Sequence, residues 1–99
     1  FRAEAQVSTF TLSRLMETRK TAESLKVLHQ LLDSGEKPER IMGGLRASWT
    51  RYPADPLSLK KRLKILLQCD LDIKTGKIKP AFALERLIVS LCVLRNFSG

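Results

Sequence analysis

The chain has 99 residues, a length that suits a single domain spanning residues 1–99, and its 43% hydrophobic and 28% charged residues are typical of a folded globular protein rather than a disordered one. No uninterrupted apolar run exceeds four residues, which excludes a membrane-spanning helix of about 20 apolar residues. The 18 basic and 10 acidic residues leave a net charge of +8, which favours a polyanion, an anionic membrane surface or an acidic protein as partner, unless the charge is only a solubilising surface.

Glycine and proline divide the chain into five segments, and each segment has a helical period. The first runs over about residues 5–17 and the second over about residues 21–35, where Gly35 suits the left-handed position just past a helix end. The third begins at Pro38, and its Gly43–Gly44 pair either marks a close approach of another helix or is tolerated without one. The predicted buried face of this third helix consists of Ile41, Leu45, Trp49 and Tyr52.

The fourth helix is expected to begin at Asp55 or Ser58, either of which can cap it, and to stop at Gly76. The fifth begins at Pro80 and continues through Leu94. Its second half is apolar nearly all round, a pattern typical of a helix that is central in its domain or covered by a partner. No segment alternates with a period of two, so we predict an all-α fold, a compact bundle of about five helices with short connections.

The chain is poor in residues for catalysis. Cys69 and Cys92 are far apart in sequence and His29 is the only histidine, so we expect no metal site, and two reduced thiols in a cytoplasmic protein without a secretory signal. His29 is expected to be a packed or boundary residue. There is no P-loop and no GxGxxG fingerprint, so we expect no cofactor and no enzymatic activity. The chain begins with Phe1 and is expected to be a piece of a longer protein.

Asp70 is the most informative single residue. On a helical wheel with Leu59 as the origin it falls at about 20°, inside the arc of leucines of the fourth helix. A buried carboxylate needs a partner. Lys74, one turn later, stands in the favourable acid-then-base order, and Arg86 on the fifth helix is another candidate. We predict a structural polar pair that ties the end of the fourth helix to the fifth.

Two further surfaces are candidates for binding. Lys60, Lys61 and Lys64 form a basic stripe on the fourth helix that suits phosphate contacts, although a solvated charged face is the alternative. No aromatic residues interleave with this stripe, so stacking of single-stranded bases is not indicated. On the fifth helix a second apolar side is either core or a subunit contact, and it consists of Phe82, Val89 and Val93.

Two motifs stand near the end of the chain: residues 66–76 read LLQCDLDIKTG, and residues 83–87 read ALERL. They resemble the Asp-Leu-x-x-Lys-x-Gly and Leu-Glu-Arg-Leu segments that end the bacterial DNA polymerase III delta subunit. The turn from Gly35 to Pro38, followed by Ile41, is also similar to that family. Further similar positions in the first two helices are Phe10, Leu12, Ala22, Leu25, Leu28, Leu31 and Leu32.

The resemblance implies a subunit of the clamp loader, the ATP-driven machine that places the sliding clamp on primed DNA during replication. In this family an N-terminal ATPase-like part contacts the clamp, and a C-terminal helical domain packs with the other subunits into a ring-shaped collar. The chain would be that collar domain, a non-catalytic module of the bacterial cytoplasm associated with the nucleoid. Its expected partners are other loader subunits, with DNA secondary and with no membrane or small-molecule substrate.

One departure concerns the connection between Trp49 and Leu57. Family members place a further helical stretch there, whereas this chain has only the short segment 52–56, so a divergent, delta-like protein is an open alternative. The rival from another class is a small basic DNA-binding helical domain that uses Lys60, Lys61 and Lys64. A third hypothesis is a helical adaptor unrelated to replication.

Overall fold

The computed structural model describes the backbone of residues 2–51 and 55–98 and the side chains of residues 9–51 and 55–92. These residues form helices and no strand, which confirms the predicted all-α bundle. Compared with the predicted bounds, the first helix begins about three residues earlier, the second ends before Gly35, and the fifth continues past Leu94. They are α1 (Arg2–Glu17), α2 (Thr21–Asp33), α3 (Pro38–Arg51), α4 (Pro56–Lys74) and α5 (Pro80–Ser98).

Two helices end at glycines, as predicted, and both glycines have the left-handed conformation that was expected for Gly35. Gly35 follows α2 with φ of 94°, and its N–H donates to the carbonyl of Leu32 at 3.0 Å. Gly76 follows α4 with φ of 72°, and its N–H donates to the carbonyl of Ile73 at 3.1 Å. Because this conformation costs glycine little, both helices stop where the chain must turn.

The first turn of α4 is capped by Asp55, one of the two predicted candidates. Its Oδ1 accepts a hydrogen bond from the N–H of Ser58 at 2.7 Å, and the Ser58 hydroxyl donates to Oδ2 at 3.2 Å. The hydrogen bond from the backbone of Ser58 lowers the pKa of the Asp55 carboxyl. The cap therefore fixes the start of α4 as an ionised side chain at neutral pH.

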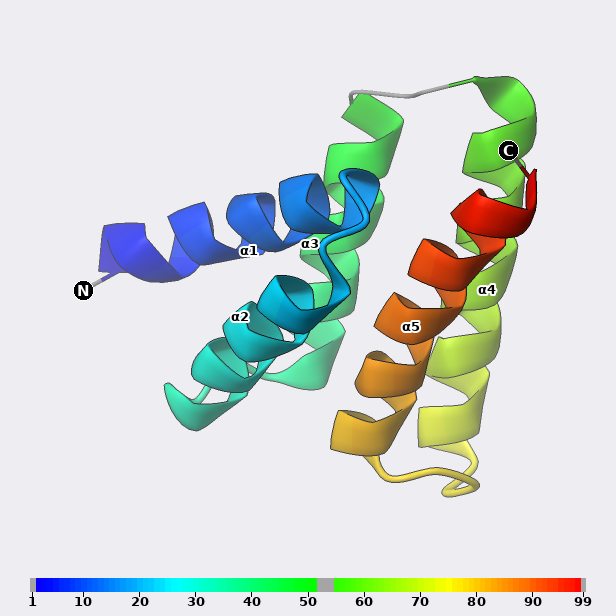
Figure 1. Ribbon diagram of the computed structural model, residues 1–99. Helices are drawn as coiled ribbons and strands as arrows, with labels where there is room; N and C mark the ends of the chain where they lie inside the picture. The colour runs from blue at the N-terminus through cyan, green and yellow to red at the C-terminus, as the bar shows by residue number, and fades with distance from the viewer. Residues whose placement is uncertain (1, 52–54, 99) are drawn as a thin grey trace.

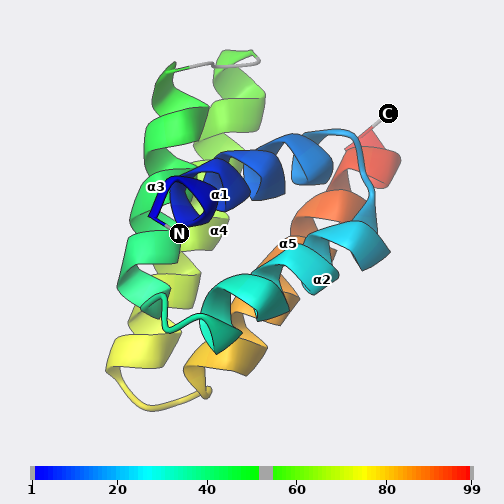
Figure 2. The same ribbon diagram turned by 90° about the vertical axis from the view of Figure 1, so that its left-hand side faces the viewer.

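The helices form two groups, which meet where α5 packs against α1, α2 and α3 and where α4 packs against α3. In Figure 1, α4 and α5 lie side by side and run in opposite directions, with α1, α2 and α3 on the other side of the molecule. The turned view of Figure 2 shows α1 crossing α3. The fifth helix packs against all four of the others, so the predicted central position of this helix is confirmed.

The core lies where α1, α2 and α3 meet α5. Trp49 is fully buried there, and so are Ile41 and Leu45 from the same face of α3, as predicted. Tyr52, the last residue predicted for that face, lies outside the described residues. The other fully buried apolar side chains are Leu12, Leu28, Leu31, Leu84 and Ile88.

Of the two adjacent glycines in α3, Gly44 lies at a close contact with another helix and Gly43 does not. A methyl group added at Gly44 would overlap Cγ2 of Thr9 in α1, whereas nothing lies within 4 Å of the same position at Gly43. Gly44 therefore allows α1 and α3 to approach closely, which is the first of the two predicted alternatives. Nearby, the hydroxyl of Ser48 donates to that of Ser13 at 3.0 Å between the same two helices.

Candidate functional site

The second apolar side of α5 is open to solvent. The exposed fraction is 61% for Phe82 and 40% for Val89, so neither side chain belongs to the core. Val93, the third member predicted for this side, lies outside the residues whose side chains are described. Large apolar side chains that remain exposed on a central helix favour a contact with another protein.

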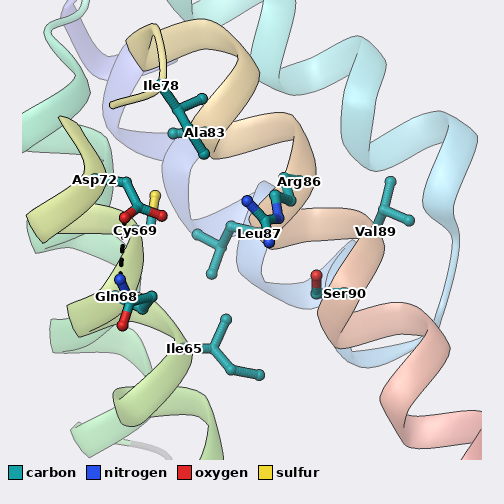
Figure 3. A pocket seen from close by; sticks show the side chains of 10 residues that line it. All are labelled: Ile65, Gln68, Cys69, Asp72, Ile78, Ala83, Arg86, Leu87, Val89 and Ser90. Atoms are coloured by element: carbon teal, nitrogen blue, oxygen red, sulfur yellow. Dashed lines mark hydrogen bonds between the residues drawn. The ribbon is translucent and has the colours of Figure 1, made fainter. Parts of the chain in front are cut away.

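Val89 also lines a groove between α4 and α5 (Figure 3). It has a volume of about 540 Å³, and its walls are mostly apolar. Figure 3 shows side chains of α4 on one side of the groove and those of α5 on the other. The lining consists of Ile65, Gln68, Cys69, Asp72, Ile78, Ala83, Arg86, Leu87, Val89 and Ser90.

Two opposite charges stand at this groove. The buried carboxylate of Asp72 accepts a hydrogen bond from Nε2 of Gln68 at 3.0 Å. Arg86 is exposed and has no ion pair with any part of the chain that the structure describes. An apolar groove with an unpaired guanidinium at its rim suits a protein surface that carries a carboxylate.

Cys69 at the floor of the groove is not a reactive nucleophile. Burial, helped by the negative charges of Asp72 and Asp70, raises the pKa of its thiol to about 11. The thiol is therefore protonated at neutral pH, and the thiolate needed for nucleophilic attack is scarce.

The predicted pair of Asp70 and Lys74 is present, but it does not tie α4 to α5. Nζ of Lys74 lies 3.0 Å from Oδ2 of Asp70 within α4. Both residues line a separate groove between α3 and α4, whereas Arg86 lines the groove between α4 and α5. The predicted role of Arg86 as a partner of Asp70 is therefore wrong, and the buried carboxylate of α4 is Asp72.

Asp70 does not face α5 because of how α4 is rotated about its own axis. The apolar residues of α4 are spread over about 280° of the helical circumference, so the leucine arc alone does not define the side that faces the core. Leu67 and Leu71, which lie in that arc, have exposed fractions of 59% and 46%. Arg62 lies at about 300° from Leu59, and this is the direction that faces the core.

Arg62 is the buried cation that sequence reasoning missed. Only 6% of the residue is exposed. Its Nη1 lies 3.2 Å from Oε2 of Glu17 in α1, and its guanidinium lies 5.8 Å from the ring centre of Trp49 in α3. The one feature of the sequence that could have indicated its burial is its position on the helical wheel, because Arg62 lies on a different side of the helix from Lys60, Lys61 and Lys64. Arg62 thus links α4 to two other helices and has a structural role.

The predicted basic stripe is exposed, but it is not purely basic. Lys60, Lys61 and Lys64 are all exposed. Lys60 and Lys64 share their face of α4 with the exposed leucines at positions 67 and 71, since all four lie within about 60° on the wheel. Lys61 lies at the edge of this face, about 100° from Lys60.

His29 joins α2 to α5 at the surface. Its side chain is half-exposed, and Nε2 lies 2.8 Å from Oε2 of Glu85, which is the position of a boundary residue. Within the described part of the chain, no three histidine, cysteine or acidic residues stand close enough together to hold a metal ion. A search of the same residues finds no helix with the length and apolar character to cross a membrane.

Comparison with family models, curated proteins and solved structures finds no match for the chain. The exposed surfaces of α4 and α5 are therefore the features from which a function can be proposed.

Proposed function

We propose that the chain is the C-terminal collar domain of a delta-like clamp-loader subunit of bacterial DNA polymerase III. In this role it is a non-catalytic oligomerisation domain in the cytoplasm. It packs with other loader subunits so that the sliding clamp is placed on DNA during replication. The observation that carries the proposal is the exposed apolar side of α5, which includes Phe82 and Val89 and continues through Val89 into the groove between α4 and α5.

The two motifs behind the resemblance have structural roles in this hairpin of helices. In LLQCDLDIKTG, Asp70 and Lys74 pair along α4, and Gly76 provides the left-handed residue that ends it. In ALERL, Leu84 and Leu87 are core residues of α5, and the glutamate between them pairs with α2. These roles support a packing module, because the motif residues shape the two helices that carry the proposed contact surface.

The test is light scattering after size exclusion, with the chain alone and mixed with the ATPase subunits of a clamp loader from the same source. At physiological salt we expect a stoichiometric complex, and we expect Phe82→Asp and Val89→Asp to abolish it. Leu57→Asp is the matched control, because Leu57 is an exposed apolar residue at the start of α4. A wild-type chain that elutes as a monomer in the mixture would contradict the proposal.

A small basic DNA-binding domain is the second candidate, and the exposure of Lys60, Lys61 and Lys64 supports it. DNA binding through these lysines would weaken with salt, with a slope of about −0.9 per phosphate contact in a plot of log K against log salt. Fluorescence anisotropy with duplex DNA, for the wild type and a Lys61→Gln variant, measures this slope. A slope that the variant leaves unchanged would exclude Lys61 from any DNA contact.

A further inference from the structure

We infer that the outer face of α4 is a docking site for an acidic amphipathic helix of another protein. We define the α4 outer face by Lys60, Lys64, Leu67 and Leu71. It points directly away from the core, since these residues centre at about 110° on the wheel and buried Arg62 lies at about 300°. The inference does not depend on the collar proposal, which concerns α5.

The spacing of the four residues suits a helix as the partner. Steps of four, three and four residues keep them in one straight row on α4, and this alternation is the one by which packed helices contact each other. The row from Lys60 to Leu71 is about 17 Å long, which corresponds to about three turns of a partner helix lying beside it.

The two leucines give this face an apolar half. Leu67 and Leu71 are exposed and one turn apart, so they form a continuous apolar strip on the surface. Leu67 also borders the groove between α3 and α4, which has a volume of about 400 Å³. This groove is open at Gly43, where no atom occupies the space that a side chain would fill. A bulky apolar side chain of a partner helix can therefore lie against Leu67 and enter the groove.

The two lysines determine the charge of the partner. Lys60 and Lys64 are exposed, and within the described residues neither has a carboxylate within 4.0 Å. The acidic residues on either side of them in sequence are already engaged, since Asp55 accepts from Ser58 as the helix cap and Asp70 is paired with Lys74. Carboxylates on the partner, placed one or two turns from its apolar residues, complement these cations and steer its approach.

Other occupants fit this face less well. A second copy of the chain carries a net charge of +8 and would bring lysines against lysines. The phosphates of DNA would satisfy the lysines but leave both leucines in water, and an apolar strip of two leucines is small for membrane insertion. The acidic helix is the occupant that uses all four residues.

The experiment uses the whole chain and a designed probe. The probe is a synthetic helical peptide of three heptads with leucine at positions a and d and glutamate at positions e and g, labelled for fluorescence anisotropy. We expect saturable binding at physiological salt and no binding of the same peptide with lysine in place of glutamate. Absence of binding by the acidic peptide overturns the inference.

Matched variants show whether the binding occurs at the α4 outer face. We expect Lys60→Glu to weaken binding of the peptide by about tenfold. Lys61→Glu makes the same change of charge one residue away, and we expect it to have little effect on this affinity. We also expect Leu67→Ala and Leu71→Ala to weaken it, with Leu57→Ala as the control. Equal loss with Lys60→Glu and Lys61→Glu overturns the inference, because it shows only general charge attraction.

Two further probes separate the other occupants. The probes are duplex DNA and phosphatidylcholine vesicles that contain phosphatidylserine. If either competes fully with the peptide, and its own binding is unchanged by Leu67→Ala and Leu71→Ala, the face binds anions and not a helix. The inference then fails. Phe82→Asp on α5 must leave peptide binding unchanged, and Leu67→Ala must leave the loader complex unchanged. Failure of the collar proposal is therefore distinguishable from failure of this one.

Discussion

A single side chain, that of Arg62, holds three helices together. Its charged end contacts Glu17 of α1 and the ring of Trp49 of α3, while its backbone belongs to α4. The aliphatic part of an arginine also contributes apolar packing when the residue is buried. Removal of the side chain therefore takes away an ion pair, a cation–π contact and core packing together.

We expect Arg62→Ala to lower the free energy of unfolding by about 2 kcal/mol, because the ion pair with the partly exposed Glu17 and the packing of the buried arginine are lost together. Urea denaturation followed by circular dichroism measures the change. Lys61→Ala, which removes an exposed cation next to it in sequence, is expected to change the stability by less than about 0.5 kcal/mol. Equal losses of stability in the two variants would show that Arg62 contributes to stability no more than an exposed cation does.

The thiol of Cys69 makes the free energy of unfolding depend on pH in the alkaline range. Its pKa is raised to about 11 from an ordinary value of 9.0, so between these values the unfolded chain releases a proton that the folded chain keeps. Stability that is present below pH 9.0 is therefore lost as the pH rises towards 11. We expect the loss to be smaller in Cys69→Ala, measured by urea denaturation across this range. The same loss in both proteins would assign it to other groups.

At the scale of the helix, the two adjacent glycines of α3 are expected to respond to the same substitution in opposite ways. Gly43→Ala should stabilise the protein by about 0.5–1 kcal/mol, because the site is open and alanine favours a helix. Gly44→Ala should destabilise it, because the new methyl overlaps Thr9 of α1.

Thermal denaturation of both variants measures this difference. A second substitution, Thr9→Ser, removes the overlapping Cγ2 and keeps the hydroxyl, so it should recover part of the stability that Gly44→Ala loses. Stabilisation by Gly44→Ala alone would contradict a close approach of α1 and α3.

The helix ends marked by a cap or a glycine could be predicted from the sequence, whereas the start of α1, the end of α5 and the rotation of α4 could not. The signals at Asp55, Gly35 and Gly76 are local, because a cap or a left-handed turn depends on a few neighbouring residues. The buried side of α4 depends on how its neighbours α3 and α5 pack against it. Because apolar residues surround most of that helix, periodicity did not reveal that Arg62 is buried or that Leu67 and Leu71 are exposed.

The same distinction holds for the candidate surfaces. The second apolar side of α5 was visible in the sequence because that helix has more apolar residues than one face can hold. The groove beside it, with Asp72 and Arg86 from two different helices, is a product of the tertiary arrangement. No spacing within one helix indicates which residues of another helix will face it.

Over the whole molecule, the chain has a net charge of +8, and few ion pairs within its described part offset the repulsion among its basic side chains. Three pairs of acidic and basic side chains within 4.0 Å are Glu36–Arg40, Glu17–Arg62 and Asp70–Lys74, and the first and last of these join residues only four apart in sequence. Repulsion between the remaining cations opposes the compact state, and this repulsion is long-ranged when the salt concentration is low.

We therefore expect the melting temperature to rise as NaCl increases from about 10 mM to about 150 mM, since the screening length falls from about 30 Å to about 8 Å. Differential scanning calorimetry measures the change. Lys60→Gln combined with Lys64→Gln removes two charges and should make the rise smaller. A melting temperature that falls with salt would show that attraction between charges outweighs repulsion.

The central position of α5 also has a consequence for synthesis. Ribosomes release the chain from its N-terminus, so α1, α2 and α3 emerge before the helix that covers Leu28 and Leu31 exists. Until then the three helices have no apolar surface that completes their core. The fold therefore closes only after α5 has left the ribosome, and a nascent chain arrested before Pro80 would present its leucines to chaperones instead of to α5.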